Sequence, residues 1–172
     1  MDSFPIFRPG RRTQYNTVTG VITEIAPMTG QGVGGCRQLV TVESGGNITN
    51  FVITPDTYVA DAITLRVGMQ AHFVYNADLP AILIYPPQYT AVAVVPTTVA
   101  AGVKAGFFDN RLVSSDNTLQ LNVTRNVPVV TSNNQTFTGS PRGRYLLVLY
   151  NRSTRSIPAQ TTPERVVVMC EW

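Results

Sequence analysis

Charged side chains are scarce in this sequence: Asp, Glu, Lys and Arg together make up 13% of its 172 residues, about half the share of an average globular protein. Lys104 is the single lysine and His72 the single histidine. No apolar run approaches the roughly 18 residues that a membrane-spanning helix needs. The apolar share of 44% is nevertheless too high for a disordered chain. These shortages favour a folded protein with no membrane span.

The residues and motifs of enzyme chemistry are also missing. The sequence has no Gly-x-Ser-x-Gly, His-Glu-x-x-His or phosphate-binding P-loop motif. The glycine-rich segment Thr29–Gly35 is not followed by a helix pattern, so it lacks the helix N-terminus that would hold a phosphate. His72 stands between Ala71 and Phe73 in a strand pattern, which favours a half-buried or cross-strand histidine. We therefore expect a non-enzymatic protein with no catalytic residue, no cofactor and no metal.

Cysteine is limited to Cys36 and Cys170, with no Cys-x-x-Cys pair. This pattern provides neither a zinc site nor a disulfide framework. Two interpretations stay open: incidental thiols, or a disulfide formed within or between chains. The first residues also lack the basic start and apolar run of a secretory signal peptide, which predicts cytoplasmic synthesis.

The plentiful residues are those of strands and turns: Val, Thr and Tyr recur, and 13 glycines and 12 prolines are scattered as turn signals. Two apolar runs around Ser44–Asn47 give the clearest hairpin signal. No helical period separates the apolar runs, so the first half predicts a small barrel or sandwich. Its expected strands are Val18–Ile25, Leu39–Glu43, Ile48–Thr54, Gln70–Asn76 and Tyr89–Val95.

The same order of segments recurs in the second half at offsets of about 70 to 86 residues, which is typical of an internal duplication. The matched pairs are Val18–Ile22 with Val103–Phe108, Phe51–Asp56 with Leu121–Asn126, Gly68–Asn76 with Gly143–Asn151, and Pro87–Val92 with Pro163–Val168. We therefore predict an extended N-terminal arm at 1–17, a β-barrel unit at 18–95, a linker at 96–102 and a second unit at 103–172.

Four motifs stand out in the sequence: the turn Val67-Gly68-Met69 and the segments Asn50–Tyr58, Leu83–Tyr89 and Thr154–Pro163. Together they resemble an uncharacterised family of Gram-positive bacterial proteins with tandem OB-like small β-barrel units. The resemblance covers roughly residues 18–170 and implies an all-β fold of two tandem OB-like barrels. It carries no assigned activity. OB-like folds often bind oligonucleotides or oligosaccharides, but Pro55–Val67 is too short for their usual helix.

A modest net charge of +3 comes almost entirely from arginine. The candidate polyanion contacts lie in the second unit: Arg142, Arg144, Tyr145, Arg152, Arg155 and Arg165. A strand of a barrel would place Arg142 and Arg144 at one end and Arg152 and Arg155 at the other. This arrangement favours separate groups over a continuous nucleic-acid track, so nucleic acid is not the favoured partner.

Two other features favour protein contacts. Proline stiffens equivalent connections at Tyr85–Pro87 and Ile157–Pro163. The arm carries Phe4, Ile6 and Phe7, and an extended segment of this kind adds readily to a sheet edge. The leading hypothesis is a binding or scaffolding protein that acts through protein–protein contacts, including self-assembly through the arm. The alternative is an OB-type module for oligonucleotides or oligosaccharides.

Overall fold

The computed structural model describes residues 11–30, 34–80 and 84–170. Within these ranges the chain forms strands, one short 3-10 turn (η1) and no α-helix, so the expected all-β class is confirmed. The elements are β1 (Tyr15–Pro27), β2 (Gln38–Ser44), β3 (Asn47–Ile53), β4 (Tyr58–Val59), η1 (Ala60–Ala62), β5 (Gln70–Asn76), β6 (Gln88–Pro96), β7 (Gly102–Phe108), β8 (Leu119–Leu121), β9 (Val129–Val130), β10 (Arg144–Tyr150), β11 (Ala159–Thr161) and β12 (Arg165–Val168).

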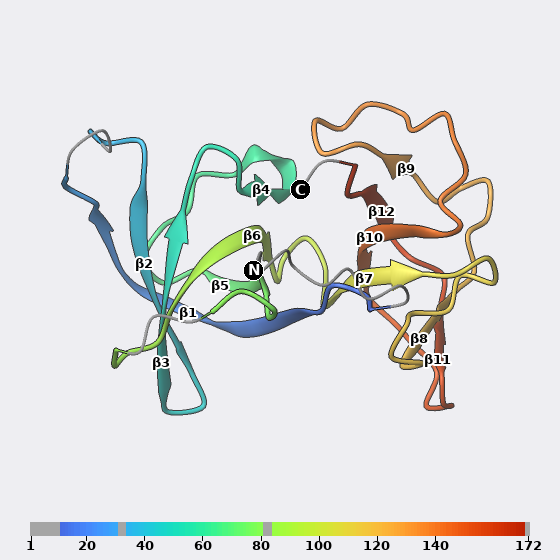
Figure 1. Cartoon of the computed structure of the whole chain (residues 1–172), viewed down its shortest axis with the longest axis horizontal. Coiled ribbons are helices and arrows are strands. Elements are labelled where there is room, and N and C mark those ends of the chain that lie inside the picture. The colour runs from blue at the N-terminus through green and yellow to red at the C-terminus, as the bar shows by residue number, and fades with distance from the viewer. Residues whose placement is uncertain (1–10, 31–33, 81–83, 171–172) are drawn as a thin grey trace, which may run out of the picture.

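The first five long strands close into a barrel (Figure 1). Their order is β3-β2-β1-β5-β6, and a parallel pairing between β3 and β6 completes the circle. Alternation along β2 explains why the sheet has an inside: Val40 and Val42 are buried, whereas Thr41 and Glu43 lie on the outer side. The barrel is filled by Ile22, Val40, Val42, Phe51, Ala71, Phe73, Ala91 and Val94.

The second half pairs its strands in two smaller sheets. One has the order β7-β10-β12-β9, and the other joins β8 and β11 in parallel. Isolated bridges link Phe108 with Ser114 and Val113 with Gln120, so the segment between β7 and β8 contacts both strands. A separate apolar core fills this half: Phe108, Leu112, Leu119, Leu121, Val127, Leu146, Val148, Val166 and Val168.

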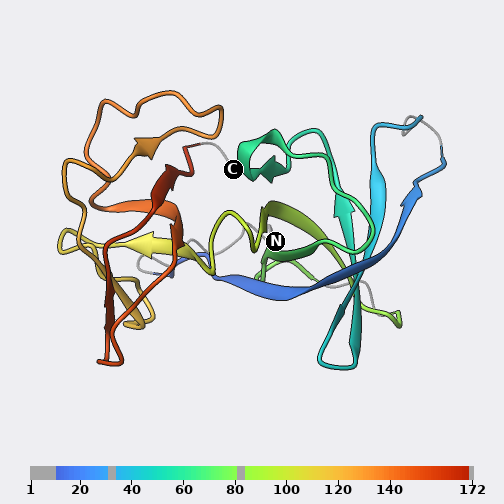
Figure 2. The same cartoon turned by 180° about the vertical axis from the view of Figure 1, so that it is seen from behind.

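A third core lies between the halves, which sit side by side along the long axis in Figures 1 and 2. Val74 and Val95 enter it from the first half, and Leu147 and Val167 from the second. Ala100, in the expected linker, is also part of this core. Because apolar surface from both halves is buried together, the halves are joined by packing as well as by the chain.

Most expected strands are present, with small shifts at their ends. The first begins at Tyr15, three residues before the expected start, because Tyr15–Val21 pairs with β5. The hairpin predicted at Ser44–Asn47 is present, and its two glycines adopt φ values of +56° and +84°. Such values suit glycine, so the Gly-Gly signal identified the turn for a physical reason.

Candidate binding surfaces

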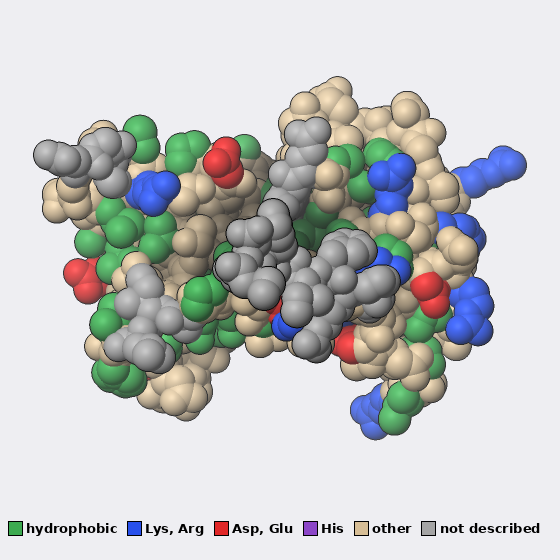
Figure 3. Space-filling view, viewed as in Figure 1, with side chains coloured by type: hydrophobic (Ala, Val, Ile, Leu, Met, Phe, Trp, Pro, Cys, Tyr) green, Lys and Arg blue, Asp and Glu red, His purple; other side chains and the backbone are tan. Residues whose placement is uncertain are grey.

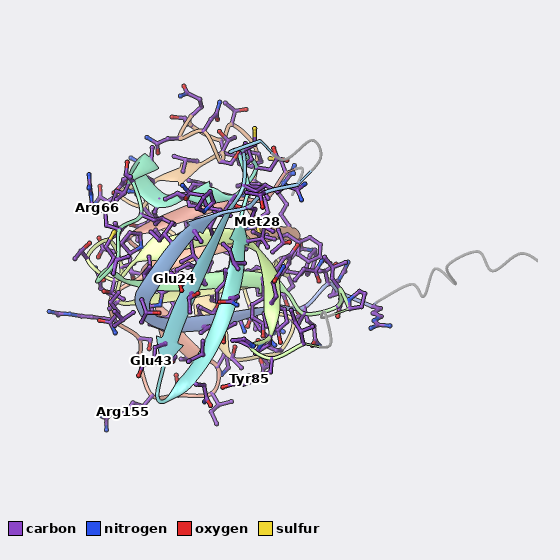
Figure 4. The ribbon with its side chains drawn as sticks, turned by 90° about the vertical axis from the view of Figure 1, so that its left-hand side faces the viewer. Glu24, Met28, Glu43, Arg66, Tyr85 and Arg155 are labelled. Carbon is purple, nitrogen blue, oxygen red and sulfur yellow. The ribbon has the colours of Figure 1, made fainter. Side chains whose placement is uncertain are left out.

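Two proline loops expose large apolar side chains. Tyr85 precedes a cis proline in the β5–β6 connection, and Ile157 precedes a cis proline in the β10–β11 connection. Tyr85 is 81% exposed and Ile157 is 89% exposed. Figure 4 shows Tyr85 and Arg155, which comes two residues before Ile157, toward the lower edge of the molecule. Sequence reasoning identified both loops as stiff, and the structure adds that each presents an uncovered apolar residue.

The second of these loops is held by its own polar groups. The hydroxyls of Thr154 and Ser156 lie 2.7 Å apart, and Ser156 donates to the carbonyl of Pro158 at 2.8 Å. The backbone amide of Gln160 donates to the Thr154 hydroxyl, and the Thr154 amide donates to the Gln160 carbonyl, both at 2.9 Å. These bonds fix the backbone on both sides of Ile157, so its side chain is displayed on an ordered loop.

A second candidate site lies at the end of the barrel, where β3, β5 and β6 meet. The rings of Tyr75 and Tyr89 stack with centroids 4.0 Å apart. Phe51 lies behind both rings, and it stacks in turn on Phe73 inside the barrel at 4.8 Å. A pocket of about 220 Å³ is lined by both tyrosines. We call this stacked pair, backed by Phe51, the aromatic floor of the pocket.

The candidate polyanion contacts are not brought together. Arg142 donates to the backbone carbonyl of Asn110 at 2.6 Å, and Arg144 lies over the ring of Phe137 at 4.9 Å. Arg152 and Arg155 are exposed beyond the other end of β10. Figure 3 shows the basic side chains on this half as separate groups.

Arg165 and Tyr145 serve the contact between the halves. Arg165 forms an ion pair of 2.9 Å with Asp61 of the first half and also contacts the hydroxyl of Tyr58. Asp61 and Tyr58 together raise the pKa of the Arg165 guanidinium, against the opposing effect of its burial. Tyr145 packs edge-on against Tyr15 of the first half at 6.3 Å. Neither side chain stands free for a nucleic acid.

His72 is buried more fully than the half-buried or cross-strand position that the sequence favours, and both of its ring nitrogens form hydrogen bonds. Nδ1 lies 2.7 Å from the hydroxyl of Thr19, and Nε2 lies 2.9 Å from the carbonyl of Ala100. A carbonyl only accepts, so Nε2 carries a proton and donates it. The histidine thus ties the turn between the two halves to the barrel, a role that no sequence pattern indicated.

The described part of the arm contacts both halves of its own chain. The guanidinium of Arg12 lies 3.7 Å from the ring centroid of Phe107, and Arg11 lies 3.9 Å from the carboxylate of Asp78. The apolar arm candidates Phe4, Ile6 and Phe7 lie outside the described residues. Residues 11–14, which we call the arm root, therefore lie against both halves, next to the boundary between them.

The two thiol candidates, Cys36 and Cys170, are free and exposed. Cys36 follows the glycine-rich segment, and Cys170 lines a groove between the halves together with Tyr58 and Asn133. Exposure leaves both sulfurs accessible to an oxidant or to a second chain.

No protein-family model matches this chain, and no curated protein matches it either. Among residues 11–30, 34–80 and 84–170, no group of three or more His, Cys, Asp and Glu side chains is placed to hold a metal ion. The same part of the chain contains no helix long and apolar enough to cross a membrane. A functional proposal for this chain therefore depends on the geometry of its surfaces.

Proposed function

We propose that this chain is a non-enzymatic binding or scaffolding protein that acts through protein–protein contacts. The observation that carries the proposal is a pair of proline loops, each with an uncovered apolar side chain, Tyr85 and Ile157, and the Ile157 loop is held by its own hydrogen bonds. Burying one such side chain against a partner contributes about 1.5–3 kcal/mol. Aromatic side chains are also frequent at the energetic centres of protein interfaces.

Rigidity is the second support. The shared core and the ion pair between Arg165 and Asp61 hold together the two halves that carry Tyr85 and Ile157. A binding surface that is already ordered loses less conformational entropy when its partner arrives. Two loops on one body also act together, because the first contact raises the effective concentration of the second.

We also infer that the two halves are related OB-like small barrels. The pairing pattern β1-β5-β6-β4 of the first half has the same order and directions as β7-β10-β12-β9 of the second. The parallel pair β3–β6 corresponds in the same way to β8–β11. A closed five-stranded barrel is the architecture of the OB fold.

Local details favour the same relation. Thr54 and Thr124 each accept a hydrogen bond from the backbone amide two residues later, at Asp56 and Asn126 respectively. Gly68 precedes β5 and Gly143 precedes β10, and both glycines have positive φ. The cis prolines Pro86 and Pro158 lie in equivalent connections. Unrelated halves would not be expected to share these three devices.

Self-assembly through the arm is part of the proposal. The arm leaves its root beside the boundary between the halves, and its apolar residues Phe4, Ile6 and Phe7 supply the chemistry for a contact with a second copy. Deleting residues 1–10 keeps the root and removes these side chains. If the arm joins copies, the mass measured by light scattering falls to that of the monomer while the β spectrum is unchanged. An unchanged mass in a multimeric protein would assign assembly to another surface.

The OB-type alternative of oligonucleotide binding has less support. Glu24 and Glu43 stand on the outer face of the sheet formed by β1 and β2, as Figure 4 shows. Carboxylates on this face repel phosphate. The arginines of the other half are separate and partly engaged, as described above.

The test of protein binding removes the two apolar side chains. The mass of the wild type measured by light scattering should rise with protein concentration if it self-associates, and the double variant Tyr85→Ser, Ile157→Ser should lose this rise. If the partner is another protein, the wild type should capture it from extracts of the native host and the double variant should not. Val67→Ser is the matched control, because Val67 is 62% exposed but lies outside both loops. Equal association by wild type, control and double variant would overturn the role of the loops.

A further inference from the structure

We infer that the barrel-end pocket over Tyr75 and Tyr89 binds one ring of a neutral sugar. This inference is independent of the protein contacts proposed above. The pocket combines an aromatic floor with uncharged polar groups at its rim, contributed by Asn76, Gln88 and Thr90. None of the described residues that line it carries a charge.

Hydrogen-bonding capacity at the rim is unused. Among the described residues, none hydrogen-bonds to the side chain of Gln88 or Thr90. The Oδ1 atom of Asn76 accepts from the backbone amide of Asp78 at 2.9 Å, which orients the amide group and leaves its NH2 available. Amide and hydroxyl groups that both donate and accept match the hydroxyls of a sugar. A charged ligand would find no counter-ion here.

The carboxylate nearest in sequence, that of Asp78, is engaged elsewhere. It accepts from the backbone amide of Gln14 at 3.2 Å and lies 3.9 Å from Arg11, in the cleft on the arm side. The Asp78 carboxylate therefore contacts the arm root, and the described residues at the rim of the pocket are uncharged.

Size and shape limit the ligand. The volume of about 220 Å³ is smaller than the roughly 300–1,000 Å³ of pockets that enclose drug-sized molecules. This volume suits a ligand group of about the size of one six-membered ring. The apolar side chains of Val52 and Leu79 face the same pocket. A pyranose has both an apolar C–H face and a polar edge, which an aromatic floor with an amide rim accommodates.

The experiment is an NMR titration of the full chain with glucose, galactose, mannose and N-acetylglucosamine, each to tens of millimolar. At least one sugar should shift the side-chain amide signals of Asn76 and Gln88 with a saturable curve. Gln88→Ala should weaken that binding about three- to tenfold, the effect of one lost net hydrogen bond. Gln38→Ala, an exposed glutamine at the start of β2, should leave it unchanged.

Three results would overturn the inference: no saturable shift with any of these sugars, equal affinity in Gln88→Ala and wild type, or stronger shifts at this pocket with inorganic phosphate or oligothymidylate. The Tyr85→Ser, Ile157→Ser variant should retain the sugar titration. Loss of protein association with retained sugar binding therefore separates this site from the proline loops.

Discussion

At the scale of single residues, His72 does more than fill space, because its ring links Thr19 to the carbonyl of Ala100. We predict that His72→Leu lowers the free energy of unfolding by about 1–3 kcal/mol, the cost of leaving buried polar groups without partners. Leucine is the apt replacement, since Leu147 occupies the matching place in the second half. Urea denaturation at neutral pH measures the change.

The control is Thr19→Val in the His72→Leu background. In His72→Leu, the Thr19 hydroxyl and the Ala100 carbonyl both lose their hydrogen-bond partner. Thr19→Val removes the hydroxyl, so the double variant should recover part of the lost stability. Additive losses in the double variant would contradict the hydrogen-bonded link between Thr19 and His72.

Asp116 gives a pH dependence at the same scale. Partial burial opposes its charged form, but hydrogen bonds from Lys104, Ser114 and Thr118 outweigh burial and hold the pKa of Asp116 well below its ordinary value of 3.8. A depressed folded-state pKa stabilises the fold above pH 3.8, and this contribution is lost as the pH falls further. Asp116→Asn should therefore lower the melting temperature at pH 7 and much less near pH 2.

Lys104→Met is the matched variant, because Lys104 donates to the same carboxylate. The difference in melting temperature between Lys104→Met and the wild type should become smaller between pH 7 and pH 2. Both side chains are partly exposed, so high salt should also reduce the effect at pH 7. If the melting-temperature difference between either variant and the wild type stays constant with pH, the ion pair of Asp116 and Lys104 is not the source of the pH dependence.

At the scale of elements, the close approach of β1 to β2 depends on one glycine. A Cβ at Gly20 would lie 2.3 Å from the carbonyl oxygen of Glu43 and 2.8 Å from a methyl of Val42. We predict that Gly20→Ala destabilises the protein by about 1–3 kcal/mol, as overpacking does in other cores. Thermal denaturation followed by circular dichroism measures the loss.

Gly106 supplies a control, because the proposed relation between the halves matches it with Gly20. On the edge of β7 opposite β10, a single isolated bridge between Phe108 and Ser114 takes the place of a paired strand. A Cβ at Gly106 has no atom within 4 Å. Gly106→Ala should therefore change stability by less than about 1 kcal/mol. Equal losses at the two glycines would show that backbone conformation, rather than the close approach of β1 to β2, decides the outcome.

At the scale of the whole molecule, the core between the halves predicts that they unfold together. Leu147 is fully buried in that core, and Leu147→Ala should cost about 2–5 kcal/mol. Calorimetry of the wild type should show one transition with equal calorimetric and van't Hoff enthalpies. The variant should keep one transition at a lower temperature. Two separate transitions in the wild type would mean that the halves are energetically independent.

The strands and the main hairpin were predictable because their signals are local. Alternation of apolar and polar residues needs only neighbours in sequence, and the Gly-Gly turn needs only backbone conformation. Hydrogen bonding sets Val94 opposite Phe73 and Val166 opposite Val148. The proposed relation between the halves therefore matches Val166 with Val94, whereas the sequence match pairs it with Thr90. Valine-rich segments look alike in every register, and only their pairing partners distinguish the registers.

The all-β class and the long strands follow from the sequence, since composition and period-two alternation act over a few residues. Tertiary structure alone decided the short parallel strands β4, β9 and β11, because two or three residues carry no periodicity and their partners are remote. The tertiary structure also decided which polar residues have a structural role. His72 and Arg165 serve the joint between the halves because chain segments far apart in sequence meet there.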